Sequence, residues 1–461
     1  MNQQKKAFPP LRSGKLCRRM ARLLALVALL FPSLSGAEPL SLTQAYNLAL
    51  HYDARYLSAE ADTRIAREEV AKARSGFLPN IKSSTSRGRN QTDHTTIYGE
   101  EPTIWYNTLS YTLSVRQPLF NLPAIASYKQ SKAVKAKSES LFQGEHSSLI
   151  VRTVEFFCDV LYSEENLAFT DAQLKALQEQ LEQSKKRYAN GFGTITEINE
   201  AQASYDLAVA EHASAIGGLE SRRRELEQIT GLYADDLCRL DPKRLMLSEP
   251  DPRNVESWIE MAREQSGKIK AARQEVEIAR KEVDKNKTSR YPQLDLWGGR
   301  SYSVSENNYT IGSTYNTWSV SLQMSVPIYT GGYTSASIRQ ATARRQKAGE
   351  ELHLEERDTL TSVRKYYNAQ INSIVQVRAY EQAVKSGEIA LEGTRKGFMA
   401  GFRTNTEVLD ATRKLFESRR TLAKARYEYL LNRLKLRDAA GVLGEEDIEA
   451  INRFFVPTAG A

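Results

Sequence analysis

The chain carries the same series of landmarks twice, about 210 residues apart. The clearest is the segment Gly191–Ile198, which returns in similar form as Gly401–Val408. Three further pairs keep the same order, namely Gly231 and Gly441, Pro118–Phe120 and Pro327–Tyr329, and Ile65–Val70 and Ile278–Val283. Such a repeat indicates a duplicated architectural unit. The sequence therefore predicts an extended structure such as a wall or a tube, more than one compact domain around a pocket.

The first 37 residues have the pattern of a secretory signal peptide. A basic stretch without acidic residues precedes the short apolar segment Leu23–Phe31, and Ser35, Gly36 and Ala37 supply a cleavage site. A membrane anchor is the alternative, but the apolar segment is far shorter than the roughly 20 residues that a spanning helix needs. No cysteine follows the expected cut, so we do not expect a lipoprotein.

Composition argues against several classes of function. The full chain has 64 basic and 56 acidic residues, but seven of the basic residues lie in the predicted signal peptide, which leaves 57 against 56. The charge therefore gives no reason to expect nucleic acid as a partner. Cys158 and Cys238 are too few for a disulfide framework, and Cys158 lies in an apolar helical register that predicts a buried thiol.

Motifs of enzyme active sites are also missing from the sequence. The five histidines are scattered without the spacing of metal ligands. No nucleophile motif, phosphate loop or dinucleotide fingerprint is present. We therefore expect no enzyme activity, no metal and no cofactor.

Each half of the duplicated region reads as helix, two strands, very long helix, turn and shorter helix. Strands are predicted at about 80–90 and 103–116, and apolar residues alternate with Ser, Thr and Gln in Leu109–Val115 and Trp318–Val326. The polar positions suit a water-filled lumen, and the segments Gln91–Pro102 and Glu306–Tyr315 resemble surface loops. A possible aromatic girdle consists of Trp105, Tyr106, Tyr111, Trp297, Tyr302 and Trp318. A soluble sandwich would alternate in the same way, so the alternation alone decides nothing.

Two proline-free runs predict helices of unusual length, from Pro123 to about Tyr188 and from Tyr333 to about Phe398. Each has about 66 residues and would be about 100 Å long at 1.5 Å per residue. Their apolar residues form a narrow stripe that is typical of a coiled-coil seam. The shorter helices are predicted at 194–230, 254–287, 404–440 and 40–75. By length, the first two stack end to end beside one long helix, and the last two stack beside the other.

Four strands cannot close a barrel, and lipid does not tolerate open strand edges. We therefore expect other copies of the chain to complete the sheet, with three copies favoured by pore size alone. The expected organisation is an internally duplicated α+β membrane protein. Its parts are a signal peptide (1–37), a first repeat (38–231), a linker at mid-height (232–252), a second repeat (253–445) and a C-terminal segment (446–461).

Three motifs carry a resemblance to a known family. They are Gln117–Asn121 (Gln-Pro-Leu-Phe-Asn), Val326–Gly332 (Val-Pro-Ile-Tyr-Thr-Gly-Gly) and Val408–Thr412 (Val-Leu-Asp-Ala-Thr). Together with the duplicated plan they resemble TolC-type outer membrane factors, over about Leu40 to Phe455. The resemblance implies a homotrimer in the outer membrane of a Gram-negative bacterium. Its twelve-stranded barrel, in contact with lipid, would continue as an α-helical coiled-coil tunnel through the periplasm.

The two repeated turns share one construction. A glycine can end the long helix in the left-handed conformation, and a threonine can cap the next helix with a glutamate three residues later, as a capping box. The resemblance makes these turns the periplasmic tip, where an adaptor protein docks. The residues concerned are Gly191, Phe192, Thr194, Gly401, Phe402 and Thr404. Helix initiation alone is the plainer explanation for Glu197 and Glu407.

Acidic pairs follow both turns, and their members lie on one helical face, Glu197 with Glu200 and Glu407 with Asp410. The resemblance implies that Glu407 and Asp410 face a closed lumen, and that Arg403 locks this gate by bonding Glu197 or Thr196. Exposed links of this kind are individually weak, so a docking partner could open them. Phe398 stands where the family has a tyrosine, so one link of the family's gate is absent.

The function that these expectations favour is the exit duct of a tripartite export system. The segment Gln202–Ala208 resembles the branch that serves type I protein secretion, with an ABC-type inner-membrane transporter and a periplasmic adaptor as partners. The exit duct of a multidrug efflux pump is the alternative. A periplasmic coiled-coil scaffold or adaptor is the alternative of another class.

Overall fold

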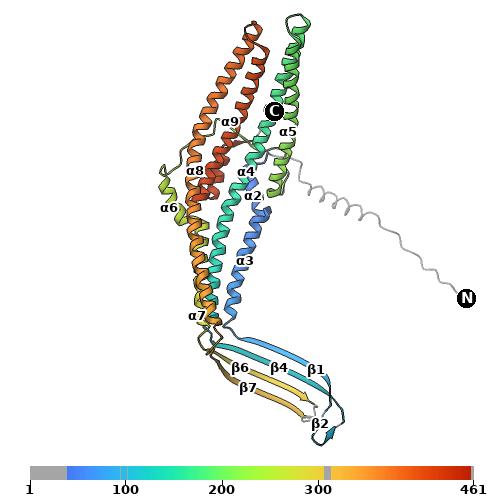
Figure 1. Ribbon diagram of the computed structural model, residues 1–461, viewed down its shortest axis with the longest axis vertical. Helices are drawn as coiled ribbons and strands as arrows, with labels where there is room; N and C mark the ends of the chain where they lie inside the picture. The colour runs from blue at the N-terminus through green and yellow to red at the C-terminus, as the bar shows by residue number, and fades with distance from the viewer. Residues whose placement is uncertain (1–38, 94, 101, 306–312, 458–461) are drawn as a thin grey trace, which may run out of the picture.

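The computed structural model describes residues 39–93, 95–100, 102–305 and 313–457. The predicted signal peptide and most of the predicted loop Glu306–Tyr315 lie outside these residues. Figure 1 shows an elongated molecule with a four-stranded sheet at one end and two helical hairpins that project at the other. Long helices connect the two ends, so most of the chain is rod-like.

The two halves of the chain repeat one order of elements. The first half contains α2 (Leu42–Tyr52), α3 (Ala54–Ser75), β1 (Asn80–Thr92), β4 (Ile104–Phe120), α4 (Leu122–Ala189) and α5 (Ile195–Thr230). The second half contains α6 (Val255–Gln265), α7 (Gly267–Thr288), β6 (Gln293–Ser305), β7 (Ser313–Ser325), α8 (Tyr333–Met399) and α9 (Asn405–Ala440). The long helices α4 and α8 have 68 and 67 residues, which confirms their predicted length. Across the described ranges, no helix is both long and apolar enough to cross a bilayer.

The predicted helices 40–75 and 254–287 are each broken once, and the single-helix prediction is wrong there. Asp53 separates α2 from α3 with an extended backbone (φ −61°, ψ 115°), and Ser266 separates α6 from α7 (φ −54°, ψ 121°). The break at Asp53 is stabilised because its carboxylate accepts from Tyr56 N at 2.7 Å and caps α3. Arg152 of α4 donates to the same carboxylate at 3.1 Å. The periodicity of the residues in 40–75 could not predict this break, because Arg152 is 99 residues away in the chain.

The shorter helices stack within each repeat, which corrects the predicted pairing across repeats. Gly231, at the end of α5, has φ +70° and lies against the end of α2, where a Cβ would be 2.6 Å from Tyr52 Cδ2. Gly441, at the end of α9, has φ +73° and lies equally close to the backbone of Gln265 and Ser266. Helix lengths are compatible with either pairing, and these two close approaches decide it.

The main sheet is antiparallel with the order β1-β4-β6-β7, and β4 pairs with β6 to join the two repeats. Opposed residues share a face, and the register aligns Leu113 with Arg300 and Trp318. Val115, Val320 and Leu322 lie on this side, which we call the apolar face. Of the predicted girdle, Trp105, Tyr111, Tyr302 and Trp318 share the apolar face. Tyr106 and Trp297 differ in parity and lie on the polar face, so their place in an outward girdle is wrong.

Two minor elements extend the sheet end and the middle of the rod. The short strands β2 (Thr95–Thr96) and β3 (Gly99–Glu100) form the tip of the β1–β4 connection. At mid-height β5 (Arg239–Leu240) pairs with β8 (Phe455–Val456). In the chain, β8 follows the short helix α10 (Glu445–Asn452). The largest hydrophobic cluster lies here and joins α2, α4, α9 and α10. Cys158 and Cys238 belong to it and are both buried and free, which confirms the buried thiol at Cys158.

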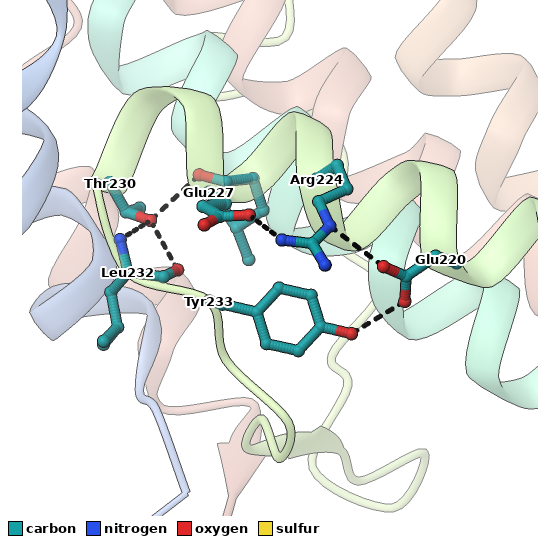
Figure 2. A network of polar contacts seen from close by, with 7 residues as sticks. Glu220, Arg224, Glu227, Thr230, Leu232 and Tyr233 are labelled. Atoms are coloured by element: carbon teal, nitrogen blue, oxygen red, sulfur yellow. Dashed lines mark hydrogen bonds and ion pairs between the residues drawn. The ribbon is translucent and has the colours of Figure 1, made fainter.

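Polar contacts fix the point where α5 passes into the linker (Figure 2). Tyr233 donates to Glu220 Oε2 at 2.7 Å, and Arg224 lies over the Tyr233 ring while it bonds Glu220 and Glu227. The hydrogen bonds that Glu220 accepts from Tyr233 and from Arg224 lower its pKa. The linker therefore leaves the helix in a defined direction, toward the mid-height sheet.

Candidate functional site

The candidate site is the pair of turns at the end of the rod that is remote from the sheet. In the α4–α5 hairpin Gly191 has φ +77°, and in the α8–α9 hairpin Gly401 has φ +79°. The next amide bonds back onto the preceding helix, with Phe192 N donating to Arg187 O and Phe402 N to Gly397 O, both at 2.9 Å. The predicted left-handed glycine at each helix end is confirmed.

The caps that start the next helices are not identical. Thr404 accepts from Glu407 N at 3.3 Å, and Glu407 Oε1 in turn accepts from Thr404 N at 3.4 Å, which completes the predicted capping box. Thr194 accepts from Glu197 N at 3.2 Å. Within the described part of the chain, however, Glu197 Oε2 is buried without a partner, so the reciprocal bond is not formed in the first turn.

Arg403 bonds a different residue from the one that the resemblance implied. Its Nη1 donates to Glu407 Oε2 at 2.6 Å, rather than to Glu197 or Thr196. This hydrogen bond, with smaller contributions from Thr404, lowers the pKa of Glu407. Glu407 is four residues ahead on the same hairpin, so its carboxylate is the nearest acid available to the guanidinium. In this conformation Arg403 therefore reinforces its own turn.

The two hairpins are instead joined by Asn405 and Thr406. Asn405 is buried, accepts from Gln180 Nε2 at 2.6 Å and donates to the carbonyl of Glu197 at 3.2 Å. Thr406 donates to Glu200 Oε2 at 2.9 Å. Sequence reasoning found Glu200 but missed Asn405 and Gln180. The signal that could have found Gln180 is its place three residues after Leu177 in the apolar stripe of α4, where a side chain is expected to be buried.

The remaining residues of the tip divide into exposed and buried groups. Asp410 is exposed on α9 and pairs with Arg413 at 3.0 Å, and Glu407 is half-buried. The rings of Phe192 and Phe402 are 78% and 87% exposed, so both turns present an aromatic side chain to solvent. Phe398 is buried, with the Arg187 guanidinium 4.6 Å from its ring centre. A search of the described ranges finds no cluster of three side chains able to hold a metal.

Comparison with known families decides the identity of this architecture. The family model described as outer membrane efflux protein matches residues 45–232 and 258–442, which is most of both repeats.

The chain belongs to the outer membrane efflux protein family.

This membership and the relatives of the chain place it in the outer membrane of a Gram-negative bacterium, and they confirm the resemblance to TolC-type factors. It is 34% identical to the alkaline protease secretion protein AprF of Pseudomonas aeruginosa, over 91% of this chain and 88% of AprF. It is 32% identical to the proteases secretion protein PrtF of Dickeya chrysanthemi, over 95% and 96%. Identity to TolC of Vibrio cholerae is 33%, over 89% and 93%.

The solved structure of an outer membrane channel has the same fold as this chain. The CmeC outer membrane channel of Campylobacter jejuni superposes with a TM-score of 0.75 and 14% identity, over 92% of this chain and 93% of CmeC. At this identity the likeness concerns the fold alone. The agreement spans both the sheet and the helical rod.

Proposed function

We propose that this protein is the exit duct of a tripartite export system that carries out type I protein secretion. The sequence relatives support this choice over drug efflux, because AprF and PrtF are both named for protease secretion and share 34% and 32% identity with the chain. BepC of Brucella suis, a relative named for efflux, shares 25% over 93% of this chain. Drug efflux is the alternative within the same architecture.

The observation that carries the proposal is an incomplete sheet at the end of a long rod. β1 and β7 each have 13 residues and pair with one neighbour only among the described strands. On β7 the side chains of Trp318, Val320, Leu322 and Met324 are 63% to 81% exposed. Lipid can cover such an apolar face, but the two open edges need partner strands. A ring of three chains supplies twelve strands and closes both edges.

The helices present matching surfaces for the same ring. On α5 the exposed residues Ile195, Val209 and Ile216 are separated by multiples of seven. On α8 the exposed residues Leu354, Val375 and Ile389 are separated in the same way. A heptad spacing is the pattern of a coiled-coil seam. Since α9 contacts both α8 and α4, α5 and α8 lie at the two sides of the four-helix wall, where we expect the neighbouring copies.

The tip is then the gate of the duct. Three chains bring together twelve carboxylates, from Glu197, Glu200, Glu407 and Asp410 of each copy. The bonds of Asn405 and Thr406 hold the two hairpins of one chain together, and Arg403 keeps its turn rigid. The exposed Phe192 and Phe402 are the surface on which an adaptor docks, so that the adaptor and an ABC-type transporter open the gate.

The decisive experiment deletes the gene in its own host and measures which exported proteins disappear from the medium. We expect loss of a secreted protein, restored by the intact gene, while drug sensitivity changes less. Purified protein should form heat-sensitive trimers in detergent and conduct ions in planar bilayers. A water-soluble, non-conducting monomer would instead support a periplasmic scaffold and refute the duct. Lost drug resistance with normal protein secretion would select the efflux alternative.

A further inference from the structure

The charge on the strands of the main sheet is unevenly distributed between its two faces. Asp295 is the only acidic residue within β1, β4, β6 and β7, and it lies on the polar face. There it pairs with Arg116 at 2.7 Å, so this arginine is neutralised. Three other arginines, Arg87, Arg89 and Arg300, lie on the apolar face. That face therefore carries three cations and no strand carboxylate.

All three arginines lie in the half of the sheet that is remote from the helices. β1 leaves α3 at Asn80 and reaches Arg87 and Arg89 only in its second half, while β6 leaves α7 at Gln293 and reaches Arg300 after seven residues. From Met324 to Trp318, opposite Arg300, the apolar residues of β7 span about 20 Å along the strand. The apolar band of outer-membrane sheets is about 25 Å tall, so Arg300 lies in its outer part. The arginines thus lie toward the outer rim of the band.

Arg300 is held in a geometry that leaves its outer nitrogens available. Its Nε donates to Asn316 Oδ1 at 3.2 Å, and its guanidinium lies 5.0 Å from the centre of the Trp318 ring. A guanidinium has four further N–H donors on Nη1 and Nη2, in a fork that matches two oxygens of a phosphate. Arg89 is supported in a similar way by Trp105, at 5.4 Å. Neither Arg300 nor Arg89 forms an ion pair with a carboxylate of the described residues, so no internal carboxylate competes with a bound anion.

A hollow on the apolar face adjoins this guanidinium. Gly298 has no side chain, and a Cβ there would meet nothing within 4 Å. The resulting space, about 320 Å³, is lined by Leu113, Val115, Trp318 and Val320, with Arg300 at its margin. An apolar hollow beside an unneutralised cation is complementary to a molecule that has both a hydrocarbon chain and a phosphate.

We propose that the apolar face binds a phosphate-bearing lipid of the outer leaflet, with Arg300 as the principal phosphate ligand. Arg87 and Arg89 contribute charge on the neighbouring strand, and an acyl chain occupies the hollow at Gly298. The inference rests on the proposed function, because it requires the apolar face to contact membrane lipid. Beyond general contact with membrane lipid, the inference assigns a defined binding site that selects lipids with a phosphate in the headgroup.

The test uses the purified full-length protein in detergent and native mass spectrometry with lipid A that carries two phosphates. We expect Arg300→Gln to weaken the apparent affinity about tenfold, and the pair Arg87→Gln with Arg89→Gln to weaken it further. Binding of dephosphorylated lipid A should be equal in all of these proteins. Lys82→Gln is the matched control, because it removes one positive charge from the polar face of β1. Gly298→Leu should fill the hollow and weaken both forms of the lipid.

Each outcome bears on the proposal. Equal binding of the phosphorylated lipid to the parent and to Arg300→Gln refutes it, as does displacement of the lipid by millimolar inorganic phosphate, which would indicate a site for free anions. Trimer migration and bilayer conductance are measured for every variant. If the arginine variants conduct normally but no longer distinguish phosphorylated from dephosphorylated lipid A, the site is supported. If the parent protein does not insert into bilayers, the proposed function itself is refuted. If Arg300→Gln forms no trimer, the Gly298→Leu and Arg87/Arg89 variants decide.

Discussion

The gate that we propose at the tip should loosen when alanine replaces Asn405, because this buried side chain links the two hairpins of one chain. It accepts from Gln180 at 2.6 Å and donates to the Glu197 carbonyl at 3.2 Å. Each neutral hydrogen bond contributes about 0.5–1.5 kcal/mol, and a buried amide left without a partner costs about 1–3 kcal/mol. Gln180 is only 7% exposed, so Asn405→Ala strands its amide. A loss of about 2–3 kcal/mol per chain corresponds to a 30- to 150-fold shift toward the open tip.

The assay is single-channel conductance of the purified protein in planar bilayers. We expect Asn405→Ala to raise the conductance or the frequency of open events well above those of the parent. The matched control is Gln202→Ala, which removes an amide hydrogen bond at 2.9 Å that lies within one helix near the tip. Arg403→Ala should have a smaller effect than Asn405→Ala, because its partner Glu407 belongs to the same hairpin. If Asn405→Ala conducts like the parent while Arg403→Ala opens the channel, the link through Asn405 is not the lock.

Three further predictions concern the tip and the middle of the rod. Asp410→Ala should weaken block by trivalent cations added from the periplasmic side, and equal block would show that this exposed carboxylate does not line the constriction. Arg152→Ala should destabilise the folded chain to heat by about 3–5 kcal/mol, because it leaves the buried Asp53 carboxylate without its cation; adding Asp53→Asn should restore part of the loss. Burial raises the pKa of Asp438 from 3.8 to about 6, so the folded chain keeps a proton between about pH 4 and 6 that the unfolded chain has lost, and stability falls as pH rises through this window. Asp438→Asn should therefore stabilise by about 1–3 kcal/mol at pH 7 and not near pH 4, and an equal gain in melting temperature at both values would contradict this reasoning.

Features set by neighbours along the chain could be predicted from the sequence. The long helices follow from proline-free runs with an apolar stripe, and their 68 and 67 residues agree with the expected length. The turns at Gly191 and Gly401 follow because only glycine adopts their positive φ at low cost. The apolar face of the sheet follows from the alternation of residues. In each case the determining interaction lies within a few residues of the chain.

Predictions failed where partners are distant in sequence. The break at Asp53 depends on Arg152, which is 99 residues away. Trp297 was placed in the girdle by its type, although the register of the strands puts it opposite Arg116 on the polar face. At the tip, the resemblance assigned Arg403 to the other hairpin, whereas Asn405 makes that connection from 208 residues away.

The sequence by itself determined the duplicated plan, the two long helices, the capped turns and the alternating strands, because periodicity and local hydrogen bonding specify them. Only the tertiary structure decided which short helices stack, which residue joins the hairpins, and that three arginines share the apolar face without a strand carboxylate. These features depend on close packing and strand register between segments up to about 200 residues apart, where many pairings have similar local energies and only the assembled chain selects one.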